Sequence, residues 1–308
     1  MRLLLLLIST LYLSASIENV DITPKGSNHE IGSIKILDQK LLKLKPIDGI
    51  PFGEASDIAY DRAKSILYMV GDSGDFYSFH LAISSKIDTI TPLHAYKLKN
   101  IHSRIFSTKY SDAEGMTLSK DGYPIISFER RPKVGLFRDG IMKKSYPLPK
   151  KLQSIKSYKS PNKSLESLTL HPKYGLLTVS EYPIGKRART DQTIYSLSGR
   201  RWNFTAESDK DSAVTAIEVM DDGNILVLER AYVDMLSPLV ITLKKVYLDR
   251  VVDGKCYTEI IAKMSSADGW QVDNFEGLTR VAPHRYLMIS DDNYNPLQRT
   301  LLIYFEIK

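Results

Sequence analysis

Acidic residues recur along this chain in pairs whose members are fifteen positions apart. Both members are acidic in four units: Asp57 and Asp72, Glu114 and Glu129, Glu166 and Glu181, and Glu276 and Asp291. A fifth unit keeps only its second member, with Val214 in place of the first acid and Glu229 in the second position. A turn lies midway in each unit, so both members are expected near one end of a β-hairpin. Acids gathered in this way could bind a metal ion or transfer protons.

The second unit gives the clearest hairpin signal, because Asp121 and Gly122 lie between two apolar runs. An Asp-Gly pair in this setting favours a two-residue turn, in which both positions adopt positive φ. Such a turn predicts that Glu114 lies directly opposite Glu129. In the other units we predict only proximity at one hairpin end. The position of the Asp-Gly pair in the fourth unit allows a register slip of one residue.

The units recur with a period that is typical of four-stranded propeller blades. Their first members stand at positions 57, 114, 166, 214 and 276, and helical periodicity is scarce. We therefore predict an all-β propeller with five visible blades and room for a sixth, degenerate one. Strand-like runs at residues 31–42 and 299–307 are expected to share a blade and close the ring, which removes free sheet edges.

The N-terminus determines the predicted domain organisation. Residues 1–16 contain a basic residue, an apolar run and then small residues, which is typical of a secretory signal peptide. The run is too short to span a bilayer comfortably, and no later segment resembles a transmembrane helix. We expect a periplasmic or secreted protein in which residues 17–44 supply the closing strand and residues 45–308 form one propeller domain.

The chain is basic, with a formal charge of +6 and a pI near 9.0. Seven lysines and no acid occur from Lys143 to Lys163. This segment is interpreted either as a solvated loop or as a patch that attracts phosphate-rich partners or anionic headgroups of the cell envelope. No nucleic-acid-binding motif accompanies it, so nucleic acid is not an expected partner. A single cysteine, Cys256, excludes an intramolecular disulfide.

Like charges that face each other on adjacent strands destabilise a sheet, so the acidic pairs need compensation. Calcium is one candidate, since it binds several carboxylate and carbonyl oxygens. Arginine beside the acids and a proton shared within a pair are the alternatives. The predicted metal ligands are Asp57, Asp72, Asp75, Glu181, Glu229, Asp292 and Asn293. The alternative for each is a turn-capping role, which is common for Asp and Asn.

Three segments share a short element centred on a glutamate: DAEGMT at residues 112–117, SLESLT at 164–169 and NFEGLT at 274–279. Together with the closing stretch SDDNYNPLQRTLLIYF at residues 290–305, this element resembles the phytase-like domain family, also called the esterase-like activity of phytase family. The resemblance covers residues 45–308. It implies an exported β-propeller with a phosphoesterase or phosphodiesterase-like activity. The fourth unit departs from the pattern, because Val214 and Thr215-Ala216 stand where a Glu-Gly pair is expected.

The resemblance implies, by position, that the paired acids are functional residues of the family. The predicted catalytic residues among them are Glu114, Glu129, Glu166, Glu276 and Asp291. Six basic residues are predicted to hold substrate phosphate, which arginine can bind through two hydrogen bonds: Arg130, Arg131, Lys186, Arg187, Arg230 and Arg299. A salt bridge to a neighbouring glutamate is the alternative for these side chains.

Three functions fit these observations. The first is a calcium-dependent hydrolase of small phosphoesters or phosphodiesters, in which the metal bridges the phosphate and lowers the pKa of the attacking water. The second is a calcium-dependent lactonase or carboxylesterase. The third is a non-enzymatic envelope propeller that binds a protein or a glycan. Propellers host many unrelated activities, so the fold alone does not decide between them.

Overall fold

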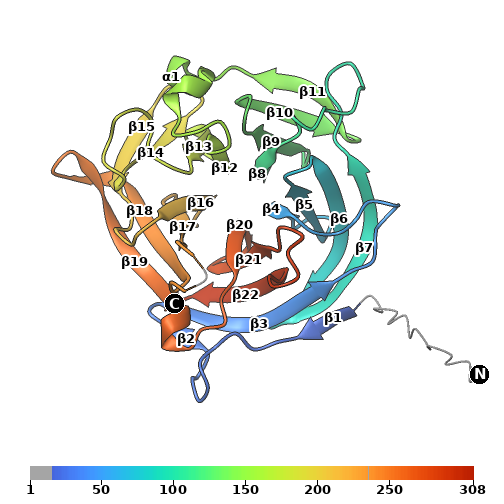
Figure 1. The fold of residues 1–308 in the computed structure, drawn as a ribbon, viewed down its shortest axis with the longest axis vertical. Helices are drawn as coiled ribbons and strands as arrows, with labels where there is room; N and C mark the ends of the chain where they lie inside the picture. The colour runs from blue at the N-terminus through green and yellow to red at the C-terminus, as the bar shows by residue number, and fades with distance from the viewer. Residues whose placement is uncertain (1–15, 235) are drawn as a thin grey trace, which may run out of the picture.

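The computed structural model describes residues 16–234 and 236–308 and shows a β-propeller. Five antiparallel sheets are arranged radially around a central axis (Figure 1). The prediction of four-stranded blades is confirmed, and the described residues form five blades rather than six. The predicted signal peptide lies, except for Ser16, outside the described residues. None of the helices within those residues is long and apolar enough to cross a membrane.

Four blades are built from four strands each, in chain order from the axis outward. The first contains β4 (Ala55–Asp61), β5 (Ile66–Gly71), β6 (Asp75–Ile83) and β7 (Ile87–Lys97). The second contains β8 (Ala113–Leu118), β9 (Pro124–Phe128), β10 (Lys133–Arg138) and β11 (Ile141–Tyr146). The third contains β12 (Leu165–His171), β13 (Gly175–Ser180), β14 (Asp191–Ser196) and β15 (Arg201–Thr205), and the fourth contains β16 (Ser212–Val219), β17 (Ile225–Ala231), β18 (Val240–Val252) and β19 (Lys255–Ser265). A short helix, α1 (Lys150–Gln153), precedes the third blade.

The fifth blade closes the ring by joining the two ends of the described chain. Its inner strands are β20 (Asn274–Ala282), β21 (Arg285–Asp291) and β22 (Leu301–Ile307), and its outer strands are β3 (Ile34–Lys43) and β1 (Ser16–Asn19), with β2 (Glu30–Ile31) beside β3. Strands β22 and β3 pair antiparallel, with Leu302 opposite Lys40 and Tyr304 opposite Asp38. The predicted closure by N- and C-terminal strands is therefore confirmed.

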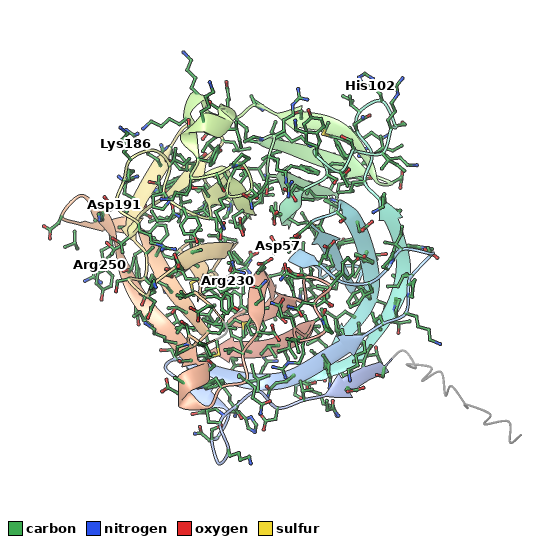
Figure 2. The ribbon with its side chains drawn as sticks, in the orientation of Figure 1. Asp57, His102, Lys186, Asp191, Arg230 and Arg250 are labelled. Carbon is green, nitrogen blue, oxygen red and sulfur yellow. The ribbon has the colours of Figure 1, made fainter. Side chains whose placement is uncertain are left out.

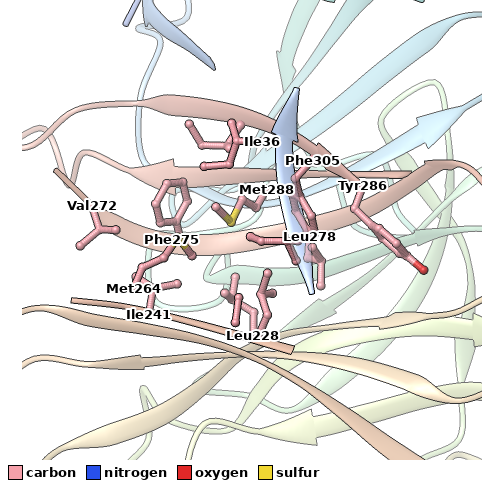
Figure 3. Close-up of a cluster of buried hydrophobic side chains, with 14 of the residues drawn as sticks. Ile36, Leu228, Ile241, Met264, Val272, Phe275, Leu278, Tyr286, Met288 and Phe305 are labelled. Carbon is pink, nitrogen blue, oxygen red and sulfur yellow. The ribbon is translucent and has the colours of Figure 1, made fainter. Parts of the chain in front are cut away.

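Apolar side chains fill the spaces between neighbouring blades. The largest cluster lies between the fourth and fifth blades, where Leu228, Ile241 and Met264 share a core with Phe275 and Met288 (Figure 3). Both faces of each sheet are covered by a neighbour, which explains why inner strands such as β17 are apolar without alternation. Burial of each large side chain of this kind contributes about 1.5–3 kcal/mol, so the packed blades form a rigid frame around the axis.

The turn between β8 and β9 differs from the predicted two-residue turn. Thr117 pairs with Ile125, which centres the hairpin on Asp121. Gly122 takes a left-handed conformation (φ 75°) after a type I-like turn, which gives a three-residue loop. The predicted opposition of Glu114 and Glu129 is therefore wrong.

A β-bulge interrupts the first strand of every blade, at its end nearest the predicted acidic sites. The register shifts at this point in all five blades, where one residue is inserted: Ser56, Glu114, Glu166, Thr215 and Glu276. A bulge re-aims the inserted side chain and bends the strand. The Glu-Gly elements fit this geometry, because a Cβ on Gly115 would lie 2.5 Å from the backbone nitrogen of Leu168, and one on Gly277 would lie 2.9 Å from the Cα of Asp57.

Asp57 links three inner strands. Its carboxylate accepts hydrogen bonds from the backbone N–H of Met116 in β8 (2.8 Å) and of Leu278 in β20 (3.1 Å), in addition to that of Ile58 (2.8 Å). The side chain lies near the axis (Figure 2) and the residue is only 2% exposed. Met116 and Leu278 lie in β8 and β20, the innermost strands of their sheets, whose inner edges leave backbone donors without a strand partner. This predicted metal ligand thus holds the inner strands together.

Replacing Asp57 by alanine is expected to lower the free energy of unfolding by about 2–5 kcal/mol, because two buried N–H groups of neighbouring blades lose their acceptor. Urea unfolding in the presence of a chelator measures this loss without any contribution from metal. The exposed Asp88→Ala variant in β7 serves as the control and should unfold like the parent. A D57A protein as stable as the parent under these conditions would contradict the structural role.

Candidate functional site

In the first and fourth blades, the bulges make the structurally equivalent residue differ by one position from the residue that the sequence repeat indicates. In each blade, one residue at the end of the second strand lies opposite the residue two positions before the bulge, as Asp291 lies opposite Asn274. We call this residue the facing position. Val214 pairs with Glu229 as predicted, but the bulge at Thr215 makes Arg230, not Glu229, the equivalent residue of the fourth blade. The bulge residues are therefore Ser56, Glu114, Glu166, Thr215 and Glu276, and the facing positions are Asp72, Glu129, Glu181, Arg230 and Asp291.

Eight of these ten side chains, all except Ser56 and Thr215, line a cavity of about 230 Å³ at the axis. Arg230 is seen near the centre of the ring in Figure 2. Every residue that lines the cavity is polar or charged: Asp72, Asp112, Glu114, Glu129, Arg130, Asn162, Lys163, Glu166, Glu181, Arg230, Glu276, Asp291 and Asn293. The cavity thus gathers eight carboxyl groups and three cationic groups, which leaves an excess of potential negative charge.

The three cations neutralise only part of this charge. Arg130 pairs with Asp112 through its Nε. The Nζ of Lys163 lies 2.6 Å from a carboxylate oxygen of Glu181. Arg230 lies 2.8 Å from Glu276 and 3.6 Å from Glu181, so it bridges the third and fifth blades.

Five of the lining acids have no salt-bridge partner among the described residues: Asp72, Glu114, Glu129, Glu166 and Asp291. Three of them accept hydrogen bonds. Asp72 accepts from the Ser56 hydroxyl (2.6 Å), Asp291 accepts from the N–H of Asn293 (2.8 Å), and Glu129 accepts from the N–H of Ser164. These bonds orient the carboxyl groups but do not neutralise them.

Burial and mutual repulsion raise the pKa values of these acids. Burial is the largest cause for Asp72, whose pKa rises to about 7 with a further contribution from Glu276. Burial likewise raises the pKa of Glu129 to about 9, although the N–H of Ser164 opposes the shift. The pKa of Asp291 rises to about 9 through burial and the charge of Glu276. At neutral pH Glu129 and Asp291 therefore hold protons and Asp72 is about half protonated, unless another cation replaces these protons.

The donor set of this cavity suits a hard divalent cation. Asp112, Glu114 and Glu129 each offer a carboxylate oxygen, and these oxygens lie within 4.8 Å of one another. Calcium binds six to eight oxygens, so further acids or amide oxygens of the cavity would have to contribute. Arg130 already occupies one oxygen of Asp112, and a bound metal would compete with it. The arrangement therefore shows two of the forms of compensation considered from the sequence, salt bridges and retained protons, and it offers oxygens for the third, a metal ion.

Several predicted metal ligands lie outside the lining of this cavity. Asp75 pairs with Lys97 (2.6 Å). Glu229 lies 3.1 Å from Lys244, on the side of β17 away from the cavity-lining Arg230. Asp292 accepts hydrogen bonds within loops, from the N–H of Glu54 and the hydroxyl of Thr300 (both 3.0 Å). Asn293, by contrast, lines the cavity as predicted.

The predicted phosphate-binding residues also divide into some that line the cavity and some that lie outside its lining. Arg130 and Arg230 line the cavity. Arg131 lies over the ring of Tyr110, and Arg187 donates to Thr193 (2.5 Å) on the outer part of the third blade. Lys186 is seen at the outer rim in Figure 2. Arg299 pairs with Asp273 (3.4 Å) outside the lining of the acidic cavity.

Three lining residues were missed from the sequence. Asp112 stands two positions before Glu114, and the DAEG segment offered a signal for it. Asn162 and Lys163 close the basic segment, which was interpreted as a solvated loop or an anionic-surface patch. The structure places Lys163 at Glu181 instead, so its charge serves the cavity.

The fold and site define a five-bladed β-propeller with an acidic central cavity. The sequence profile described as "Phytase-like: Esterase-like activity of phytase" matches residues 50–294. The chain therefore belongs to the phytase-like family, as its Glu-centred elements predicted. No curated protein matches the chain significantly.

Solved structures resemble this chain only distantly. A protein of unknown function from Bacteroides caccae is 12% identical, with a TM-score of 0.44 and coverage of 89% of this chain and 82% of that one. A calcium-binding protein, regucalcin, from Agrobacterium tumefaciens is 11% identical (TM-score 0.42, coverage 84% and 92%). Virginiamycin B lyase from Staphylococcus aureus is 8% identical (TM-score 0.41, coverage 96% and 100%). Similarities this low carry no argument about activity.

The raised pKa values predict how stability depends on pH. In the folded protein Asp72 loses its proton near pH 7, and Glu129 and Asp291 near pH 9, whereas unfolded acids ionise near pH 4. The folded state thus binds more protons across this window, and its stability falls as pH rises through it. Urea unfolding in chelator is expected to show a decreasing free energy of unfolding from about pH 5 to pH 9.

The Asp291→Asn variant provides the comparison, because its amide cannot ionise. Its free energy of unfolding should fall less steeply with pH than that of the parent. A flat or rising pH profile of the parent over this range would contradict the assignment of shared protons to the cavity.

Proposed function

We propose that this protein is a metal-dependent hydrolase of phosphate esters, with calcium as the metal. The observation that supports the proposal is the central cavity, in which five acids without a salt bridge lie beside Arg130, Lys163 and Arg230. Carboxyl groups of this kind are suited to a metal and to proton transfer, and the cations are suited to phosphate oxygens. The family description names phytase, which is consistent with a phosphate ester as substrate.

The acids of the second blade are proposed to hold the metal. Oxygens of Asp112, Glu114 and Glu129 lie within 4.8 Å of one another, and Glu166 and Asp72 lie in the same cavity. When bound, calcium would supply charge for the phosphate oxygens and lower the pKa of a water molecule. The packed blades make the inner strands rigid, so the acids on and beside these strands would hold the metal in a fixed position.

The basic residues are proposed to bind and orient the phosphate. Arg230 is held between Glu181 and Glu276, which fixes the plane of its guanidinium group in the cavity. Lys163 is held by Glu181 and retains further N–H donors. A phosphate bound at these cations would lie in the same cavity as the acids that lack a salt bridge, so the metal and the cations could both contact its oxygens.

Two acids are suited to proton transfer. Asp72 has a pKa near 7, which allows it to accept a proton from water at neutral pH. Without a bound metal, Asp291 has a pKa of about 9 and carries a proton. A calcium ion in the same cavity would lower this pKa, which would favour transfer of the proton to a leaving oxygen. Ser56 and Asn293 hold these two carboxyl groups in place through hydrogen bonds of 2.6 and 2.8 Å.

Carboxylic esters and lactones form the second candidate substrate class, because the family description also names an esterase-like activity. The same acids could activate water for attack on a carbonyl carbon. Preference for lactones or aryl esters over phosphate esters in the assay below would favour this alternative. Binding of calcium with no turnover in any of these classes would favour the non-enzymatic function.

We also propose an exported location, supported by the signal-like composition of residues 1–16. Most lysines of the basic segment lie in the partly exposed or exposed stretch before the third blade, around α1. This placement is consistent with contact between that side of the propeller and anionic surfaces, apart from Lys163, which is engaged by Glu181.

Hydrolysis of 4-nitrophenyl phosphate is expected to require calcium and to be lost on chelation. Glu114→Gln and Asp291→Asn should each lower kcat/KM by about 100-fold or more, because each removes a group that holds the metal or transfers a proton. Asp121→Asn is the matched control, since this exposed acid lies in the turn of the same β8–β9 hairpin, away from the cavity. It should retain the activity of the parent.

Metal content provides the second readout. Elemental analysis of the purified protein should find calcium that chelation removes and that E114Q binds more weakly. Full activity of the chelated protein, or equal activity of E114Q and the parent, would contradict the proposal.

A further inference from the structure

A second and larger cavity opens beside the acidic one. Its volume is about 830 Å³, and it extends between the third, fourth and fifth blades. Lys163, Glu181, Arg230 and Asn293 line both cavities, so the two spaces meet at the wall that carries Arg230. A molecule bound at Arg230 therefore faces the acidic cavity on one side and this groove on the other.

The groove differs from the acidic cavity in its electrostatics. Its acids besides Glu181 are Asp211, which pairs with Arg189 (2.6 Å), and Asp273, which pairs with Arg299 (3.4 Å). Every carboxyl group of the groove thus has a cationic partner. The groove does not add to the negative charge, and it places no demand for a second metal.

The groove also presents apolar surface that the acidic cavity lacks. Tyr182, Tyr232, Leu239, Val272 and Leu297 contribute to its lining. Tyr232 is 46% exposed and Leu297 is 76% exposed, so both side chains offer apolar surface within the groove. Exposed apolar residues that line a concave surface next to polar anchors are typical of ligand sites.

Among the described residues, the ring of Tyr232 has no aromatic, cation–π or hydroxyl hydrogen-bond partner. The ring of Tyr182 differs, because Lys163 and Arg189 lie 4.9 and 4.8 Å from its centroid. Leu297 lies in the loop that follows Asp291, and the same loop brings Asn293 to the acidic cavity. Tyr232 and Leu297 are therefore apolar side chains of the groove that follow the shared wall residues Arg230 and Asn293 closely in the chain.

We propose that this groove binds the organic group of the substrate, and that the substrates are phosphate esters with an apolar aryl or alkyl substituent. This inference rests on the proposed function and specifies its substrate class. The phosphate would lie at Arg230 and Lys163, and the substituent would cover Tyr232 and Leu297. A densely phosphorylated polyol fits less well, because its additional phosphates would meet paired cations and apolar side chains.

The test uses two diesters that share a leaving group and differ in the other substituent. Benzyl 4-nitrophenyl phosphate and methyl 4-nitrophenyl phosphate release the same 4-nitrophenolate, so the ratio of their kcat/KM values reports on the groove. The calcium-loaded, full-length protein is expected to prefer the benzyl ester by about tenfold or more. In the Tyr232→Ala, Leu297→Ala double variant the ratio should fall towards one.

Three controls separate loss of the groove from loss of the fold. Tyr232→Phe keeps the ring and should keep the preference for the benzyl ester. Val251→Ala removes an apolar side chain that is 63% exposed in the β18–β19 hairpin, and it should leave the ratio unchanged. Thermal unfolding of the double variant should match that of the parent, since both replaced side chains are exposed.

Binding of benzylphosphonate and methylphosphonate by calorimetry tests the groove without turnover. Tighter binding of benzylphosphonate, lost in the double variant, supports the groove even if no diester is hydrolysed, in which case only the proposed function fails. Hydrolysis of both diesters at equal kcat/KM, with equal binding of both phosphonates, would overturn the groove proposal and leave the hydrolase intact.

Discussion

Repulsion among eight carboxyl groups around one axis is the constraint on which the rest of this propeller depends. Buried carboxylates that lack a partner are costly, and each added charge raises the cost of the next. The chain meets this cost in two ways that are visible in the structure. Three cations pair with part of the set, and the raised pKa values show that protons occupy much of the remainder. A divalent cation would be a third way, and it would release those protons.

The frame that holds these charges together is built from backbone geometry. One bulge in each inner strand turns a side chain towards the axis, and the glycines that follow two of the glutamates let the neighbouring strand approach closely. The carboxylate of Asp57 accepts hydrogen bonds from the backbone of two neighbouring blades. The inner strands therefore keep their positions although the carboxyl groups of the cavity repel one another. A site whose groups are held in place in this way is preorganised.

The fold and much of the site could be predicted from the sequence, because a fifteen-residue spacing survives in every blade. The five blades and the gathering of most paired acids followed from that spacing, and ring closure followed from the strand-like runs near the two ends of the sequence. The bulges could not be predicted, since an inserted residue leaves the hairpin spacing almost unchanged while it shifts the register. For this reason Arg230 stands in the ring in place of Glu229, and Ser56 in place of Asp57. Long-range partners such as Lys163 and Glu181 also leave no local signal.

The pairing of β3 with β22 has a consequence for how the molecule is made. The ribosome produces β3 long before β22, so β3 can pair early with β1 and β2, but its other edge lacks its partner during most of synthesis. Contacts between such distant segments form slowly, because a long loop must close first. An open edge of this kind is prone to pair with other chains, so the incomplete blade is the part of the nascent propeller most exposed to aggregation until β22 has docked.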